Sequence, residues 1–144
     1  MSELANCNKH SLFGGFSVAD IERVEPLFDL RSFNEGAPLF DQGQPVDSIY
    51  FLLRGSVRVS RGGEELIVFR AGDSFGEMEM LDTKPAAATV TALEEVRTAC
   101  LGHKGLYDLY KLDTKLYSIF MMNLARDLAR RLRRMDELMV PGRE

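Results

Sequence analysis

The chain has 144 residues, which suits one domain that buries roughly two thirds of the surface of its unfolded chain. Hydrophobic residues at 45% and charged residues at 28% argue against a disordered chain, and the net charge of -4 gives no general attraction to nucleic acid or to an anionic membrane. No run approaches the ~20 apolar residues of a membrane span, and the first residues lack the basic and apolar regions of a secretion signal. We therefore expect a cytoplasmic protein with no membrane partner.

Reactive side chains are few and scattered. Cys7 and Cys100 are too few for a disulfide framework, and His10 and His103 are too far apart in the sequence to indicate a metal cluster. The adjacent carboxylate pairs are typical of solvated surface, and no serine lies in a nucleophile elbow. The sequence thus predicts neither an enzyme nor a metal site.

Residues 1–30 are expected to form an arm followed by a helix. The stretch to about position 16 shows no clear hydrophobic period, so we expect it to form an arm or a short turn. Ser17 and Asp20 then stand at the spacing of a helix-start signal, with Asp in place of the usual Glu. Apolar residues follow at helical spacing, and Pro26 should end or kink that helix.

Residues 31–101 change to short apolar runs separated by glycine-containing turns. Val57 and Val59 alternate with polar residues, as in a half-buried strand. Gly62 and Gly63 stand between two such runs and suit a tight hairpin. Many short strands at this spacing predict a sandwich or barrel rather than a parallel sheet.

Residues 103–139 return to a helical period. One short helix can span HKGLYDLYKL, and Asp113 can cap a longer helix that runs to about Met139. The apolar residues spaced alternately four and three apart in the longer helix are Met121, Ala125, Leu128, Leu132, Met135 and Met139. This heptad seam is typical of paired helices, although a single amphipathic helix folded onto the sheet has a similar face. Because a second flank is also apolar, we favour a helix that packs first on the barrel and then on a partner.

The expected order of elements is a helix, eight or so short strands and a long helix, and the strands include AGDSFGE ahead of PAAATV. In this order and this motif the chain resembles the cyclic nucleotide-binding domain family. The residues that fall in the family's order and spacing are Gly43, Gly55, Gly72, Asp73, Phe75, Gly76 and Glu77. The resemblance runs from about Phe13 to Met139. It implies a mainly β fold with flanking helices: a jelly-roll-like β-roll, or double-stranded β-helix, between an N-terminal helix and a long C-terminal helix.

In this family, residues corresponding to 75–89 form the phosphate-binding cassette, whose usual form is F-G-E-L-A-L, a short spacer and P-R-A-A-T. Backbone N–H groups of such a glycine-led turn can face an anion, and Glu77 can accept a hydrogen bond from a ribose hydroxyl. Matching LARRL to the family's long helix places Met135 and Asp136 where the nucleotide base is read. The expected ligand-binding residues are Phe75, Gly76, Glu77, Met78, Pro85, Ala86, Ala87, Thr89, Met135 and Asp136.

Two residues depart from the cassette pattern. Ala86 stands where the family has its arginine, and Glu79 stands where the family has a small residue. A hydrogen bond to a charged group contributes about 1.5–3 kcal/mol, so loss of the arginine alone weakens phosphate binding roughly ten- to a hundredfold. Glu79 either adds a repulsive charge or faces water. Three cations could replace the arginine: Lys84, Arg97 or Arg131.

We therefore expect a regulatory, ligand-sensing domain that spans residues 1–144 and forms a homodimer through its C-terminal helix. It would bind cyclic AMP or cyclic GMP weakly, or a different ligand, and signal through that helix. The alternative is a scaffold with a vestigial pocket that docks a partner protein. Direct DNA binding is not expected, because the chain ends at VPGRE without room for a helix-turn-helix domain.

Overall fold

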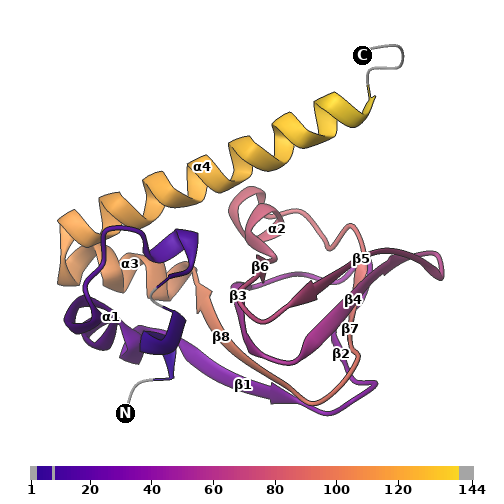
Figure 1. Cartoon of the computed structure of the whole chain (residues 1–144), viewed down its shortest axis with the longest axis horizontal. Helices are drawn as coiled ribbons and strands as arrows, with labels where there is room; N and C mark the ends of the chain where they lie inside the picture. Colours follow the sequence, from indigo (N-terminus) through magenta and orange to yellow (C-terminus); the bar gives the residue numbers. More distant parts are fainter. Residues whose placement is uncertain (1–2, 8, 140–144) are drawn as a thin grey trace.

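The computed structural model describes residues 3–7 and 9–139, with side chains as far as residue 134. It confirms the predicted fold class, a mainly antiparallel β-roll flanked by helices (Figure 1). The strands are β1 Asp29–Phe33, β2 Pro38–Phe40, β3 Ser48–Arg54, β4 Ser56–Arg61, β5 Glu64–Arg70, β6 Ser74–Phe75, β7 Thr89–Ala92 and β8 Val96–Gly102. The α-helices are α1 Val18–Val24, α2 Glu77–Asp82, α3 His103–Leu112 and α4 Thr114–Met139, and the 3-10 turns are η1 Leu4–Cys7, η2 Ser11–Phe13 and η3 Glu25–Leu27.

Two four-stranded antiparallel sheets form the roll. One has the strand order β1-β8-β3-β6 and the other β2-β7-β4-β5. The chain passes between the sheets at Gly55, where φ is 93° and an added Cβ would lie 2.5 Å from the carbonyl oxygen of Glu95. Only glycine fits such a turn, because an L side chain disfavours that φ and here has no space. The predicted hairpin at Gly62 and Gly63 is present between β4 and β5.

The hydrophobic residues gather in two cores. One core lies between the helices and the sheet that contains β3 and β8, and Phe13, Phe51 and Phe120 are buried at its centre. The second core fills the inside of the roll, where Tyr50 and Phe75 stack with ring centroids 5.3 Å apart. The roll therefore has its own packed interior, separate from the one it shares with the helices.

The N-terminal residues form two short turns and then the helix α1. Ser17 and Asp20 form the predicted capping box at the start of α1, which ends at Val24 just before Pro26. The first stretch, expected to form an arm or a short turn, contains the two turns η1 and η2. Its apolar side chains are buried, and the Asn123 side-chain amide in α4 donates hydrogen bonds to two of its carbonyls.

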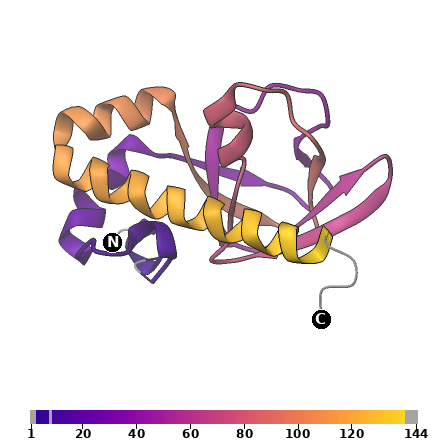
Figure 2. The ribbon, with the colours of Figure 1, turned by 90° about the horizontal axis from the view of Figure 1, so that it is seen from above.

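The long helix α4 runs along the molecule, past α2 and toward the end that carries the β4–β5 hairpin (Figure 1 and Figure 2). Its residues Leu116, Phe120 and Leu124 are buried in the helical core. The residues of the predicted heptad seam do not all lie on one exposed face. Met121 and Leu128 pack against this core, whereas Ala125 and Leu132 are exposed. The side chains of Met135 and Met139 lie outside the described residues. The apolar residues exposed together, here called the outer stripe, are Met122, Ala125, Ala129 and Leu132. Within the described part of the chain, no helix has the length and hydrophobicity needed to cross a bilayer.

Candidate functional site

A cavity of about 210 Å³ lies between the cassette, the β4–β5 hairpin, β7 and α4. Its walls are mostly apolar, and four charged side chains reach it from three elements. The lining residues are Phe40, Val59, Arg61, Leu66, Ile67, Phe69, Phe75, Gly76, Glu77, Met78, Glu79, Ala87, Ala88, Val90 and Arg131. This cavity is the candidate ligand site.

The start of the cassette is fixed by close backbone packing. Gly76 has φ 84°, and an added Cβ would lie 2.8 Å from the carbonyl oxygen of Ser48. The glycine allows the chain to leave β6 and begin α2 without a gap between α2 and β3. Glu77, the first residue of α2, is consequently carried into the interior and is only 1% exposed.

Glu77 is held by Arg131 from α4. The Arg131 Nη1 donates to Glu77 Oε1, and its Nη2 donates to the carbonyl oxygen of Ser74 at 2.9 Å. The second carboxylate oxygen of Glu77 is buried and has no hydrogen-bond partner among the described residues. Burial raises the pKa of Glu77 above its usual value, and the nearby Arg131 charge opposes that rise. Glu77, a residue of the cavity wall, therefore carries one buried carboxylate oxygen that lacks a hydrogen-bond donor.

A stack of aromatic rings stiffens one wall. The Phe75 ring lies nearly parallel to the rings of both Tyr50 and Phe69, with centroid distances of 5.3 and 5.7 Å. Leu66 and Ile67 of β5 complete this side and are each about half exposed, at 49% and 48%. Exposed aliphatic residues at a cavity mouth are suited to cover the flat face of a ligand.

The predicted cations have different positions. Arg131 lines the cavity, whereas Arg97 forms hydrogen bonds with Glu3 and Ser32 away from it. Lys84 is exposed and does not line the cavity. A cation that the sequence analysis missed, Arg61 of β4, does line it and donates from Nε to the carbonyl oxygen of Ala87 at 3.0 Å.

The predicted ligand-binding residues fall into three groups. Phe75, Gly76, Glu77, Met78 and Ala87 line the cavity together. The residues that do not line it are Pro85, Ala86 and Thr89. The side chains of the two others, Met135 and Asp136, lie outside the described residues.

Ala86, the position of the family's arginine, is 3% exposed and packs in the core of the roll. Its N–H donates to the Gln44 carbonyl oxygen at 2.8 Å, and its own carbonyl accepts from Gly43 N–H at 2.9 Å. The Cβ of Ala86 therefore lies in the interior of the roll.

Glu79 was expected either to point inward or to face water. In the structure it is half-buried and lines the cavity wall.

The remaining wall residues were not predicted: Phe40, Val59, Arg61, Leu66, Ile67, Phe69, Ala88 and Val90. They come from β2, β4, β5, β7 and the segment before β7, and apart from Ala88, which lies in the cassette, no local motif marks them. Their common signal is the pairing of strands that are distant in sequence. Among the described residues, no group of three His, Cys, Asp or Glu side chains is placed to hold a metal ion.

The sequence profile described as "Cyclic nucleotide-binding domain" matches residues 30–113. The chain is similar to the cyclic AMP receptor protein of Thermus thermophilus, with 33% identity over 130 residues, which cover 87% of this chain and 58% of that protein. A cyclic nucleotide-binding domain of Methylobacillus flagellatus superposes with a TM-score of 0.82 and 26% identity, covering 99% of this chain and 83% of that one. The Thermus thermophilus catabolite activator protein superposes with a TM-score of 0.80 and 28% identity, covering 90% of this chain and 61% of that one.

These similarities span the roll and both helical ends, but the chain covers less than two thirds of the length of the receptor protein. The matched region includes the whole cassette, with Gly76 and Glu77 in their buried positions. The profile match, the relatives and the fold agree, and the chain belongs to the cyclic nucleotide-binding domain family.

Proposed function

We propose that this chain is a regulatory sensor domain that binds a cyclic nucleotide, or a related nucleotide, in the cavity beside the cassette. The observation that carries the proposal is the buried Glu77, which has one unpaired carboxylate oxygen and accepts a hydrogen bond from Arg131 of α4 at the other. Ligand and long helix thus meet at a single side chain. The names of relatives, a cyclic AMP receptor protein and a cAMP-dependent protein kinase regulatory subunit, favour cyclic AMP as the first ligand to test.

The proposed contact at Glu77 is a hydrogen bond from a ligand hydroxyl to the unpaired carboxylate oxygen Oε2. An unpaired buried acceptor costs about 1–3 kcal/mol, and a ligand that supplies the donor recovers much of it. The sugar hydroxyl of a nucleotide is such a donor, and the apolar wall made by Phe69, Phe75 and Ile67 would cover the rest of the molecule.

Weak binding is expected from the charges in the cassette. Ala86 supplies no cation, and Glu79 on the cavity wall opposes an anionic ligand. The loss of one charge-assisted hydrogen bond corresponds to roughly ten- to a hundredfold in affinity. Micromolar rather than nanomolar binding is therefore proposed.

Signalling would pass through α4. A ligand hydroxyl at Glu77 changes the contacts that hold Arg131, and so changes which position of α4 is favoured. The shift in population is set by the difference in ligand affinity between the two helix positions. This role is regulatory rather than enzymatic, and we propose that residues 1–144 act as one cytoplasmic unit without binding DNA themselves.

We also propose that the domain is a homodimer through the outer stripe. Met122 is 55% and Leu132 is 61% exposed, and Ala125 and Ala129 between them allow close approach of a second helix. The double variant Met122→Glu with Leu132→Glu should sediment as a monomer and keep its thermal stability. Leu93→Glu, at a 41% exposed position in a turn, is the matched control and should remain dimeric. A parent protein that is monomeric at every concentration would remove the dimer from the proposal.

A scaffold without a ligand is the second candidate, and the size of the cavity favours it. The cavity of about 210 Å³ is smaller than the ~300–1,000 Å³ typical of small-molecule sites, and Arg131 and Glu77 on its wall are already paired with each other. In this alternative, the ion pair is a structural contact and the domain docks a partner protein.

Isothermal titration calorimetry with cyclic AMP and cyclic GMP separates the two candidates. The sensor proposal expects saturable micromolar binding, at least tenfold weaker in Glu77→Ala and tighter in Glu79→Gln, which removes a negative charge from the wall. A thermal-shift screen of other nucleotides extends the test. No heat and no thermal shift with any nucleotide would leave the scaffold as the function.

A further inference from the structure

We propose that Arg61, on the strand opposite the cassette, holds the anionic group of the ligand and replaces the arginine that the cassette lacks. This inference rests on the proposed function, because it assigns a residue to the phosphate of the nucleotide proposed there. Arg61 is outside the cassette in sequence and comes to it only through the pairing of β4 with β7.

The position of Arg61 follows from the hairpin. The pairing of β4 with β5 shifts between Val59 and Ser60, which pair with Ile67 and Glu65 and leave Leu66 as an extra residue. Arg61 ends β4 beyond this shift. Its Nε donates to the carbonyl oxygen of Ala87 at 3.0 Å, so the guanidinium lies against the cassette and at the cavity wall.

Most of the binding capacity of Arg61 is unused. A guanidinium has five N–H donors, and the bond to Ala87 takes only the one on Nε. Among the described residues, none accepts a hydrogen bond from the two terminal nitrogens of Arg61 and none forms an ion pair with them. Two terminal nitrogens in a plane match the oxygens of a phosphate.

The other cation of the cavity is already engaged. Both terminal nitrogens of Arg131 donate, one to Glu77 and one to the Ser74 carbonyl oxygen. Of the four charged side chains that the structure places on the cavity wall, Glu79 repels an anion, and Glu77 and Arg131 neutralise each other. Arg61 is therefore the charge that a phosphate meets without breaking an existing ion pair.

This arrangement orients the ligand. Its hydroxyl donor lies at the α2 wall, against Glu77, and its anionic group lies at the hairpin wall, against Arg61 and the neighbouring residues Ala87 and Ala88. The phosphate is consequently bound between two strands rather than at the buried position of Ala86.

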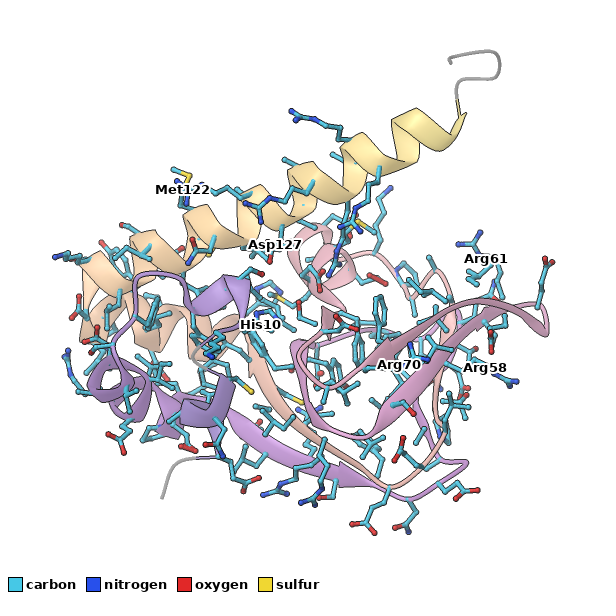
Figure 3. The ribbon with its side chains drawn as sticks, viewed as in Figure 1. His10, Arg58, Arg61, Arg70, Met122 and Asp127 are labelled. Atoms are coloured by element: carbon cyan, nitrogen blue, oxygen red, sulfur yellow. The ribbon has the colours of Figure 1, made fainter. Side chains whose placement is uncertain are left out.

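Arg58 provides a matched control. It lies on the same strand, is exposed, does not line the cavity, and points to the opposite side of the hairpin from Arg61 (Figure 3). Arg58→Gln and Arg61→Gln each remove one exposed positive charge, so they change the net charge of the protein equally. Arg61→Lys keeps the charge but loses the planar pair of donors.

The experiment is calorimetric titration of the four proteins with cyclic AMP and with adenosine, which lacks the phosphate. We expect Arg61→Gln to weaken cyclic AMP binding about ten- to a hundredfold and to leave adenosine affinity within about twofold. Arg61→Lys should lie between, and Arg58→Gln should match the parent. Thermal melts check that all variants are folded.

Two results would overturn the assignment of Arg61: cyclic AMP affinity within about twofold of the parent in Arg61→Gln, or equal losses for cyclic AMP and adenosine. The second result would mean that Arg61 shapes the cavity rather than binding the anion. Binding of neither ligand by the parent protein would instead overturn the proposed function, and with it this inference.

Discussion

Replacing Arg131 with Met should destabilise the fold by leaving Glu77 as a buried carboxylate without a cation. Met retains much of the length of the side chain, so the change removes mainly the charge and its two hydrogen bonds. The Glu77 side chain is 2% exposed, whereas that of Arg131 is 34% exposed, so water reaches the pair from the arginine side only. We expect a loss of about 2–3 kcal/mol in the free energy of unfolding at neutral pH, below the ~3–5 kcal/mol of a fully buried pair.

The loss should depend on pH in a defined direction. Burial raises the pKa of Glu77 in the folded state, so the folded protein holds this proton more tightly than the unfolded chain. The free energy of unfolding therefore falls as pH rises from the unfolded pKa of Glu through the folded one. Without Arg131 the pKa of Glu77 in the folded state is higher still. The free energy of unfolding lost in Arg131→Met should therefore be small near about pH 4.5 and grow toward neutral pH.

Urea unfolding followed by circular dichroism, at about pH 4.5 and at neutral pH, measures this. Glu77→Gln removes the buried charge, so Arg131→Met should cost under about 1 kcal/mol in that background. Arg130→Met, one residue away and with a side chain that is 65% exposed, is the control and should change stability by less than about 0.5 kcal/mol. An equal deficit at both pH values, or one that persists in Glu77→Gln, would show that Arg131 acts through packing and not through the ion pair.

Three further predictions concern the backbone, a thiol and the ligand. Gly76→Ala should lower the free energy of unfolding in urea by more than about 2 kcal/mol, because the added Cβ would meet the Ser48 carbonyl oxygen. Gly36 has the same φ of 84° but open space around it, so Gly36→Ala should lower it by only about 1 kcal/mol. Equal losses in the two variants would contradict the role of the close contact. Burial raises the pKa of the Cys100 thiol to about 11. In a Cys7→Ser variant, Cys100 should therefore react with a disulfide reagent at mildly alkaline pH only as fast as the protein unfolds. Rapid labelling of the folded protein would contradict the burial of this thiol. We also propose that Asp136 reads the base, where an ionised carboxylate would accept a hydrogen bond from the amino group of either base. Calorimetry should then find cyclic AMP and cyclic GMP affinities within about tenfold, or ~1.4 kcal/mol, and a hundredfold preference would assign the reading of the base to another residue.

Much of the fold was predictable because its signals are local. Ser17 and Asp20 mark a helix start by their own hydrogen bonds, and Gly62 and Gly63 mark a hairpin by the backbone angles they allow. The ordered glycines and the cassette motif then indicated the family. The burial of the arm was not predicted, because Leu12 and the other apolar residues of this stretch have no periodic spacing and enter the core only by packing against distant elements.

The candidate site was predictable where it is continuous in sequence. Glu77 and Gly76 belong to one short motif, and the structure places both on the cavity wall. Arg61 was missed because an arginine before a glycine turn is ordinary surface, and its approach to Ala87 depends on which strands pair. Arg131 was one of three cations predicted to replace the arginine of the cassette. The course of α4 brings Arg131 to Glu77, whereas Arg97 is hydrogen-bonded to Glu3.

The hydrogen bonds between the arm and α4 set the mechanical properties of the helix. The Asn123 amide donates to the carbonyls of Leu12 and Gly14, and the Ser11 hydroxyl donates to Asp127 at 2.6 Å, so α4 is clamped as far as Asp127. Arg131 lies one turn beyond the clamp, and the helix continues to residue 139. Twelve residues of helix form a lever of roughly 18 Å, so a tilt of about 10° at the clamp displaces its tip by roughly 3 Å. A ligand-induced rearrangement around a single guanidinium would thus be amplified by leverage before it reached any partner at the end of the helix.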